Sequence, residues 1–177
     1  MEDPSADSIV AIVGSRAAPD VELQRAFDLA RAVVGSGRFV ISGGATGIDQ
    51  AAARGAAEID PTRLIVTLPW DSFERDAVPA GAEVLTPPYP TEAVELARAW
   101  LQGFDQRGRG PRALFTRNAV IARRCSGMIA FPKGRSGGTQ HAMRCADALG
   151  KAVLDGRSEL RVGGKVFSDV QGRTALP

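Results

Sequence analysis

Two patterns of apolar residues alternate along the chain. Short, unbroken runs of mainly β-branched apolar residues, such as Ser8–Gly14, are typical of strands that are buried on both faces of a parallel sheet. Longer segments with apolar residues at helical spacing, such as Val21–Val34, are typical of amphipathic helices. The pattern therefore predicts strands and helices that alternate along most of the chain.

This alternation predicts a doubly wound α/β fold, in which a mostly parallel, Rossmann-like sheet carries helices on both faces. We expect a single domain over residues 1–177, with a core at about 8–155 and a short C-terminal β-hairpin at 158–168. Residues 105–112 are too polar and glycine-rich to pack, so we expect a mobile basic loop there. The predicted strands are 8–14, 38–42, 63–68, 83–85, 127–131 and 152–154, and the predicted helices are 21–34, 47–58, 91–103, 114–124 and 138–149.

Composition is that of a water-soluble globular protein, with 44% apolar and 24% charged residues and no apolar run long enough for a membrane helix. The acidic N-terminus lacks the basic start of a secretory signal, so we expect a cytoplasmic protein. Cys125 and Cys145 lack the spacing of a metal knuckle, and we expect both to be reduced thiols. The single histidine, His141, fits a helix surface or the core and gives no support to a catalytic triad or a multi-histidine metal site. We expect neither a metal ion nor a cofactor.

Positive charge is concentrated in one part of the chain, although the whole sequence carries a formal charge of only +2. Residues 105–151 contain ten Lys or Arg and two Asp, which gives this segment a charge of +8 and leaves −6 for the remainder. Such a local excess favours a polyanionic partner, which we expect to be a nucleotide or a single-stranded nucleic acid.

Three glycine-rich corners, each at the end of a predicted strand, form the candidate site for such a ligand. Ligands of open α/β sheets bind beyond the carboxyl ends of the strands, where helix N-termini attract anions. Glycines let a phosphate approach the backbone, and hydroxyl and cationic side chains add donors and charge. Any one corner alone also fits a tight turn that prefers Gly and Ser for steric and capping reasons. The candidate residues of the corners are Gly14, Ser15, Arg16, Ser42, Gly43, Gly44, Thr46, Gly47, Asp49, Lys133, Ser136, Gly137, Gly138 and Thr139.

Arg117 and Asn118 complete the candidate set, at the start of a predicted helix. The guanidinium fits a bidentate grip on phosphate and the amide fits a base edge, but an exposed arginine and a helix N-cap explain the same pair. Asp49 suits either the helix dipole or the hydroxyls of a ribose. Trp70 and Phe73 follow the third predicted strand, where they either stack on a base or pack under the loop.

These motifs together resemble the DNA-processing protein A (Smf) family, within the wider superfamily of Smf and LOG-type Rossmann-like domains. The resemblance runs from about Ile9 to Leu154, and its most specific parts are the stretch Ser42–Asp49 and the pair Arg117–Asn118. It implies a homodimer that holds single-stranded DNA in a basic pocket and helps to load a recombinase. Carried across by position, the pocket residues are Ser15, Arg16, Gly43, Gly44, Thr46, Arg117 and Asn118.

The enzymatic branch of this superfamily offers an alternative function, the hydrolysis of nucleoside monophosphates by phosphoribohydrolases. That branch has a PGGxGTxxE loop with a catalytic Glu on the following helix, whereas Ala142 stands at the matching position here. A methyl group neither stabilises an oxocarbenium-like state nor activates water, so the sequence favours a binding module without catalysis. Asp49, on the neighbouring corner, is the substitute acid that keeps the enzyme alternative open.

Overall fold

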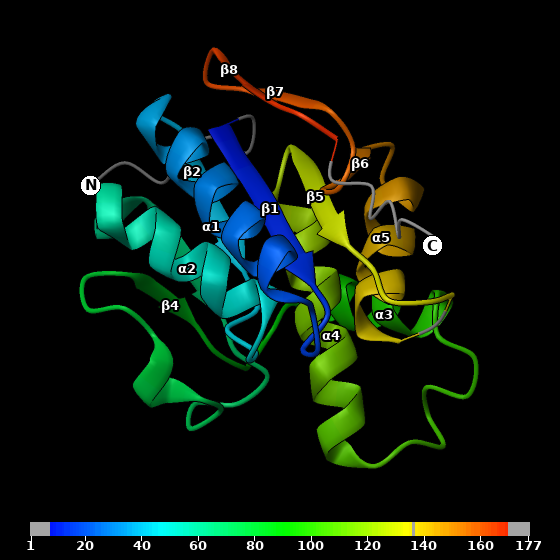
Figure 1. Ribbon diagram of the computed structural model, residues 1–177. Helices are drawn as coiled ribbons and strands as arrows, with labels where there is room; N and C mark the ends of the chain where they lie inside the picture. The colour runs from blue at the N-terminus through cyan, green and yellow to red at the C-terminus, as the bar shows by residue number, and fades with distance from the viewer. Residues whose placement is uncertain (1–7, 136, 170–177) are drawn as a thin grey trace.

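The centre of the computed structural model, which describes residues 8–135 and 137–169, is a six-stranded parallel sheet with the order β4-β3-β2-β1-β5-β6 (Figure 1). Its strands are β1 (Ile9–Gly14), β2 (Phe39–Ser42), β3 (Leu64–Thr67), β4 (Glu83–Leu85), β5 (Gly127–Phe131) and β6 (Ala152–Asp155). The helices are α1 (Asp20–Gly35), α2 (Ile48–Ile59), α3 (Thr91–Ala99), α4 (Arg109–Arg124) and α5 (Gly138–Ala148). A separate antiparallel hairpin of β7 (Leu160–Val162) and β8 (Lys165–Phe167) follows. The predicted doubly wound α/β fold with a C-terminal hairpin is confirmed.

Helices cover both faces of the sheet. α1 and α2 pack on one face, where Leu29 and Ile48 lie in the buried core, and α3, α4 and α5 pack on the other face around Ile121. Successive residues of β1 supply the two layers in turn, because Ile12 faces the first core and Val13 the second. A strand buried on both faces needs an unbroken apolar sequence, which explains the pattern of the strand segments.

The strand order reverses between β1 and β5, and this reversal positions the site. From β1 the chain builds outward to β4, then returns through α3 and α4 and places β5 on the other side of β1. Gly14 at the end of β1 pairs with Phe131 at the end of β5, so both strands end at the same level. Ligands of open α/β sheets bind in the crevice that such a reversal creates.

The largest difference from the sequence prediction concerns the basic segment before α4. The prediction of a loop over 105–112 is wrong for its second half, because α4 begins at Arg109. Gly108 is the N-cap, and Pro111 falls in the first turn, where its missing N–H costs no hydrogen bond. α3 also differs and ends at Ala99, earlier than predicted.

The C-terminal hairpin is fastened to α1 far from the reversal of strand order. The guanidinium of Arg25 donates to the backbone oxygens of Gly156, Ser158 and Ser168, which lie around the hairpin. It also lies over the ring of Phe167, with 5.5 Å between Cζ and the ring centroid. Arg25 is therefore a structural residue that ties the end of the sheet to the first helix.

Candidate functional site

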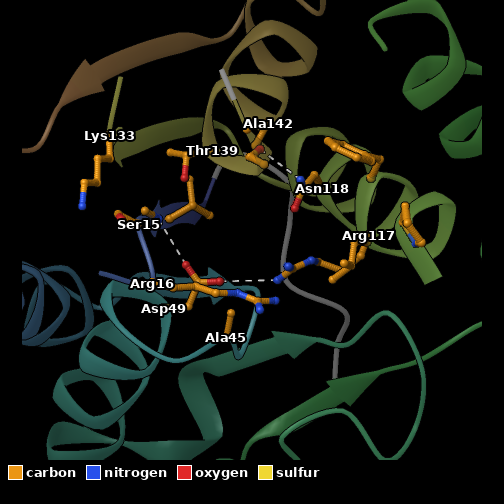
Figure 2. Close-up of a pocket in the computed structure, with 16 residues that line it drawn as sticks. Ser15, Arg16, Ala45, Asp49, Arg117, Asn118, Lys133, Thr139 and Ala142 are labelled. Atoms are coloured by element: carbon orange, nitrogen blue, oxygen red, sulfur yellow. Dashed lines mark hydrogen bonds and ion pairs between the residues drawn. The ribbon is translucent and has the colours of Figure 1, made fainter. Parts of the chain in front are cut away.

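A pocket of about 460 Å³ opens beyond the carboxyl ends of β1 and β5, at the reversal of strand order (Figure 2). The corner after β1, the first turns of α2 and α5, and one side of α4 form its walls. Its lining residues are Val13, Gly14, Ser15, Arg16, Ala45, Asp49, Pro111, Leu114, Phe115, Arg117, Asn118, Lys133, Gly137, Gly138, Thr139 and Ala142.

Most of the predicted site residues meet in this pocket, although they come from distant parts of the chain. Those that line it are Gly14, Ser15, Arg16, Asp49, Arg117, Asn118, Lys133, Gly137, Gly138 and Thr139. Those that do not line it are Ser42, Gly43, Gly44, Thr46 and Gly47, all from the corner between β2 and α2. Ser136 lies outside the described residues.

A buried ion pair forms the floor of the pocket. Oδ2 of Asp49 lies 3.4 Å from Nη1 of Arg117, and each side chain is only 7% exposed. Oδ1 of Asp49 accepts the backbone N–H of Gly14 at 3.1 Å, and the N–H of Ala45 donates to the same carboxylate. Asp49 therefore fastens α2, its preceding corner, the end of β1 and α4 to one another (Figure 2).

Arg117 and Asp49 form a pair of opposite charges, and a further positive charge, that of Arg16, lies near the pair. Burial lowers the pKa of Arg117; Asp49 opposes this shift, and the neighbouring positive charge of Arg16 adds to it. Burial likewise raises the pKa of Asp49, against the effect of Arg117. Nε of Arg117 is buried and donates to no described group. Two guanidinium groups that line one pocket and share a single buried carboxylate favour the binding of an anion.

Arg117 and Asn118 lie in the middle of α4 and are buried, so neither an exposed arginine nor a helix N-cap describes them. Nδ2 of Asn118 donates to the backbone oxygen of Gly138 at 3.0 Å and thereby joins α4 to the start of α5. The guanidinium of Arg117 lies directly on Gly43, where a Cβ would be 1.4 Å from Nη1. Glycine at position 43 leaves room for another group to contact the backbone closely, and the guanidinium of Arg117 fills this room.

The corner between β2 and α2 uses its polar groups inside the protein. Oγ of Ser42 donates to the backbone oxygen of Ile12 at 2.8 Å. The N–H and the hydroxyl of Thr46 both donate to Oε2 of Glu74, at 2.8 and 2.7 Å. These donors are consequently already paired.

The glycines of this corner shape the chain and leave little space. Gly44 and Gly47 both have positive φ angles, of +70° and +96°. A Cβ on Gly47 would lie 2.4 Å from the backbone oxygen of Ser15, which accepts the N–H of Ile48 at 3.2 Å. The β2–α2 corner and the β1 corner are therefore packed tightly together.

The corner between β5 and α5 differs, because its internal hydrogen bonds use carbonyl oxygens. Nε2 of Gln140 donates to the oxygen of Gly134 at 3.0 Å, and Asn118 donates to the oxygen of Gly138. Gly137 is the N-cap of α5 and offers no side chain as a cap. Within residues 8–135 and 137–169, no group accepts the N–H of Gly138 or of Thr139. Among the described residues these two N–H groups have no acceptor, so they are the candidate donors for an anion at the pocket.

An apolar wall that the sequence analysis missed faces this turn. Pro111, Leu114 and Phe115 line the pocket from α4. The signal was present, because these positions and Asn118 share one helical face at spacings of three and four residues. The prediction that the helix starts at Leu114 left only Pro111 outside this face.

Three candidate residues take structural roles. Phe73 is buried, packs edge to face on Trp70 with 5.1 Å between the ring centroids, and carries the guanidinium of Arg16 at 5.5 Å. Neither aromatic residue lines the pocket. His141 is buried as well, and its Nε2 lies 3.1 Å from the backbone oxygen of Ala97. His141 thus belongs to the core.

The described residues offer neither a membrane span nor a metal centre. None of the helices in this part of the chain combines the length and the apolar character that a bilayer demands. No three His, Cys, Asp or Glu residues among those described come together as metal ligands. Cys125 and Cys145 are free and buried, and burial raises the pKa of the Cys145 thiol to about 12.

Comparison with protein families gives one match over nearly the whole chain. The family model described as DNA recombination-mediator protein A matches residues 3–172. No individual curated protein matches the sequence.

Several solved structures share the fold. DNA processing protein A from Streptococcus pneumoniae is 23% identical with a TM-score of 0.61, and the match covers 83% of this chain and 49% of that one. DNA processing protein A from Helicobacter pylori, described by its single-stranded DNA binding mode, is 21% identical with a TM-score of 0.57 over 85% of this chain and 70% of that one. A molybdenum cofactor binding protein from Rippkaea orientalis is 19% identical with a TM-score of 0.59, over 83% and 74% of the two chains. At these identities the likeness concerns the fold alone.

Proposed function

The chain belongs to the family of DNA recombination-mediator protein A, and from this premise we propose that its pocket binds the phosphate of a nucleotide or of single-stranded DNA. In this proposal the protein acts as a binding module. Phosphate oxygens accept hydrogen bonds from the N–H groups of Gly138 and Thr139. Arg16 and Arg117 neutralise the negative charge of the phosphate.

The observation that carries the proposal is that the guanidinium groups of Arg16 and Arg117 line the same pocket as the N-terminus of α5, which no described side chain caps. Two independent sources of positive potential meet there, a side-chain cation and the dipole of α5. Arg117 lines the pocket, and hydrogen bonds between a charged group and an oxygen ligand contribute about 1.5 to 3 kcal/mol each.

The apolar wall of α4 suits the base of the same nucleotide. Phe115 has an aromatic ring, and Pro111 and Leu114 extend the apolar surface beside it. Bases stack on such surfaces with little regard to their identity. A phosphate site on one side and an apolar wall on the other match the two ends of a nucleotide.

Hydrolysis of nucleoside monophosphates receives less support. Both carboxylate oxygens of Asp49 are engaged, one by Gly14 and the other by Arg117, so this residue is poorly placed to act as an acid. Ala142, at the position of the Glu in phosphoribohydrolases, brings only a methyl group to the pocket. We therefore retain binding without catalysis as the proposal.

A titration of labelled oligo(dT) and of a panel of nucleoside monophosphates, at about 50 and 200 mM salt, tests the proposal. Counterion release predicts that the affinity for oligo(dT) falls with salt, by a log-log slope of about −0.7 for each phosphate contacted. A nucleotide that binds without such a slope identifies a mononucleotide ligand. No binding of either ligand contradicts the proposal, and release of free base from a bound nucleotide establishes the enzyme instead.

Arg16→Ala and Arg161→Ala form a matched pair for this experiment. Arg16 is exposed and lines the pocket, whereas Arg161 is exposed on β7, away from it. Loss of a charged hydrogen bond costs about 1.5 to 3 kcal/mol, so we expect Arg16→Ala to bind about 10- to 100-fold more weakly. Arg161→Ala removes the same charge and should bind like the wild type. Equal losses in both variants would mean that binding is not localised in the pocket.

The homodimer and the recombinase partner also remain proposals, supported by family membership. Sedimentation of the purified protein tests the first, with the dimer mass as the expected result. Co-purification with a recombinase, with and without single-stranded DNA, tests the second. A monomer at all concentrations, or no co-purification, would remove the respective part.

A further inference from the structure

A carboxylate from another part of the chain occupies the start of α2. Oε2 of Glu74 accepts the N–H of Thr46 at 2.8 Å, the hydroxyl of Thr46 at 2.7 Å and Nε2 of Gln50 at 2.7 Å. Glu74 lies between β3 and β4, 28 residues beyond Thr46. A negative group is thus bound by backbone and side-chain donors together, as an anionic ligand would be.

Two further observations set this contact apart from an ordinary helix cap. Glu74 has a φ angle of 43°, and it is the non-glycine residue with positive φ within the described part of the chain. Its neighbour Phe73 lies under the guanidinium of Arg16, which lines the pocket. The segment that carries Glu74 therefore contacts the β2–α2 corner and a pocket cation at the same time.

The bound carboxylate is close to the pocket along the chain and in space. Thr46 directly follows Ala45, which lines the pocket. Gly47 packs on the corner after β1, where a Cβ would lie 2.7 Å from Cα of Arg16. Thr46 and Glu74 do not line the pocket, so a ligand in the pocket reaches this carboxylate only if it extends beyond Arg16.

We infer that Glu74 is an internal competitor for a polyanionic strand, which occupies the donors of Thr46 and Gln50 and so limits binding to the pocket itself. The inference rests on the proposed function. Carboxylate and phosphate oxygens accept the same N–H and O–H donors, so only one of the two anions is held at this place. A mononucleotide does not reach it, whereas a longer strand has to displace the carboxylate or turn away.

Glu74→Gln, compared with Asp76→Asn, tests this inference. Both changes remove one negative charge from the same segment, but only Glu74 contacts Thr46 and Gln50. In Glu74→Gln we expect oligo(dT) to bind about two- to fivefold more tightly, the scale of one anion at a helix N-terminus. The neutral amide oxygen of Gln still accepts hydrogen bonds but more weakly than a phosphate, so the strand displaces it, contacts one more phosphate and steepens the log-log salt slope by about 0.7. The affinity for dTMP should change equally in both variants.

The outcomes separate the inference from the proposed function. An unchanged salt slope, or weaker oligo(dT) binding, in folded Glu74→Gln overturns the inference while the wild-type titration still supports the pocket. No binding by the wild type or the variant overturns both. Thermal unfolding shows whether each variant folds. If Glu74→Gln does not, Glu74→Asp, whose shorter side chain withdraws from Thr46, should give the same steeper slope, and an unchanged slope there also overturns the inference.

Discussion

The two glycine-rich corners beside the pocket differ in what holds them. At the corner between β2 and α2, the carboxylates of Asp49 and Glu74 accept the backbone and hydroxyl donors. At the corner between β5 and α5, neighbouring side chains bind carbonyl oxygens, and no group within residues 8–135 and 137–169 accepts the N–H groups of Gly138 and Thr139. The first corner carries its own anions, whereas the second presents its donors to a ligand.

This difference shows that a glycine-rich corner after a strand has two distinct uses. In the first corner, glycine allows the protein to pack on itself, as Arg117 does on Gly43. In the second, a Cβ on Gly137 would meet nothing within 4 Å, so the space around it is open. The same residue type thus serves internal packing in one corner and access in the other.

We expect the largest effect from Asp49→Ala, which tests whether internal anions hold the β2–α2 corner. This change leaves Arg117 buried without its partner and frees the N–H groups of Gly14 and Ala45, so we expect the free energy of unfolding to fall by about 3 to 5 kcal/mol. Urea denaturation measures this change in the free energy of unfolding. Asp71→Ala, which removes an acid whose side chain is 85% exposed, is the control and should keep the wild-type midpoint. Similar midpoints for both variants would show that the ion pair does not hold the corner.

Arg117→Ala should lower both stability and affinity, because Arg117 serves the fold and the pocket together. We expect phosphate binding to weaken by about 1.5 to 3 kcal/mol, the value of a charged hydrogen bond. The midpoint of urea unfolding should also fall, since Asp49 loses its partner. Arg16→Ala, at an exposed position, should lower affinity alone. Unchanged affinity in folded Arg117→Ala would exclude this residue from the site.

The variants Gly43→Ala and Gly138→Ala compare the β2–α2 corner directly with the β5–α5 corner. A Cβ on Gly43 collides with Nη1 of Arg117, so we expect a loss of about 1 to 3 kcal/mol in stability. A Cβ on Gly138 would lie 3.4 Å from Nδ2 of Asn118, and alanine favours the helix, so stability should hold. Ligand affinity should nevertheless fall by about 1 kcal/mol, because a phosphate can no longer approach the backbone as closely. Full affinity in Gly138→Ala would place the ligand elsewhere.

Lys133→Ala should have the smallest effect. Lys133 is exposed at the rim of the pocket, where salt screens its charge. If it contacts one phosphate, the log-log salt slope for oligo(dT) becomes shallower by about 0.7, with little change in unfolding. A slope equal to that of the wild type would show that the strand does not pass Lys133.

The sequence was sufficient for the fold and for most of the pocket. Buried strands need unbroken apolar runs, and residues at the ends of neighbouring parallel strands must converge, so Gly14, Ser15 and Gly137–Thr139 could be placed in one pocket from their positions alone. The first turn of α4 could not, because Gly108 and Pro111 are typical of a loop as much as of a helix start.

The sequence could not distinguish the two corners, because the difference depends on partners far along the chain. Asp49 pairs with Arg117 across 68 residues, and Thr46 binds Glu74 across 28. Local composition contains no record of such contacts. The position of Arg117 in the middle of α4 was missed for a related reason, since the start of that helix was predicted too late.

The most direct test of the account follows backbone amide resonances while oligo(dT) is added to the wild-type protein. We predict that the amides of Gly138 and Thr139 shift on binding, while those of Ala45 and Thr46 stay in place because Asp49 and Glu74 already hold them. Shifts confined to Ala45 and Thr46, with Gly138 and Thr139 unmoved, would contradict the assignment of the β5–α5 corner as the anion site.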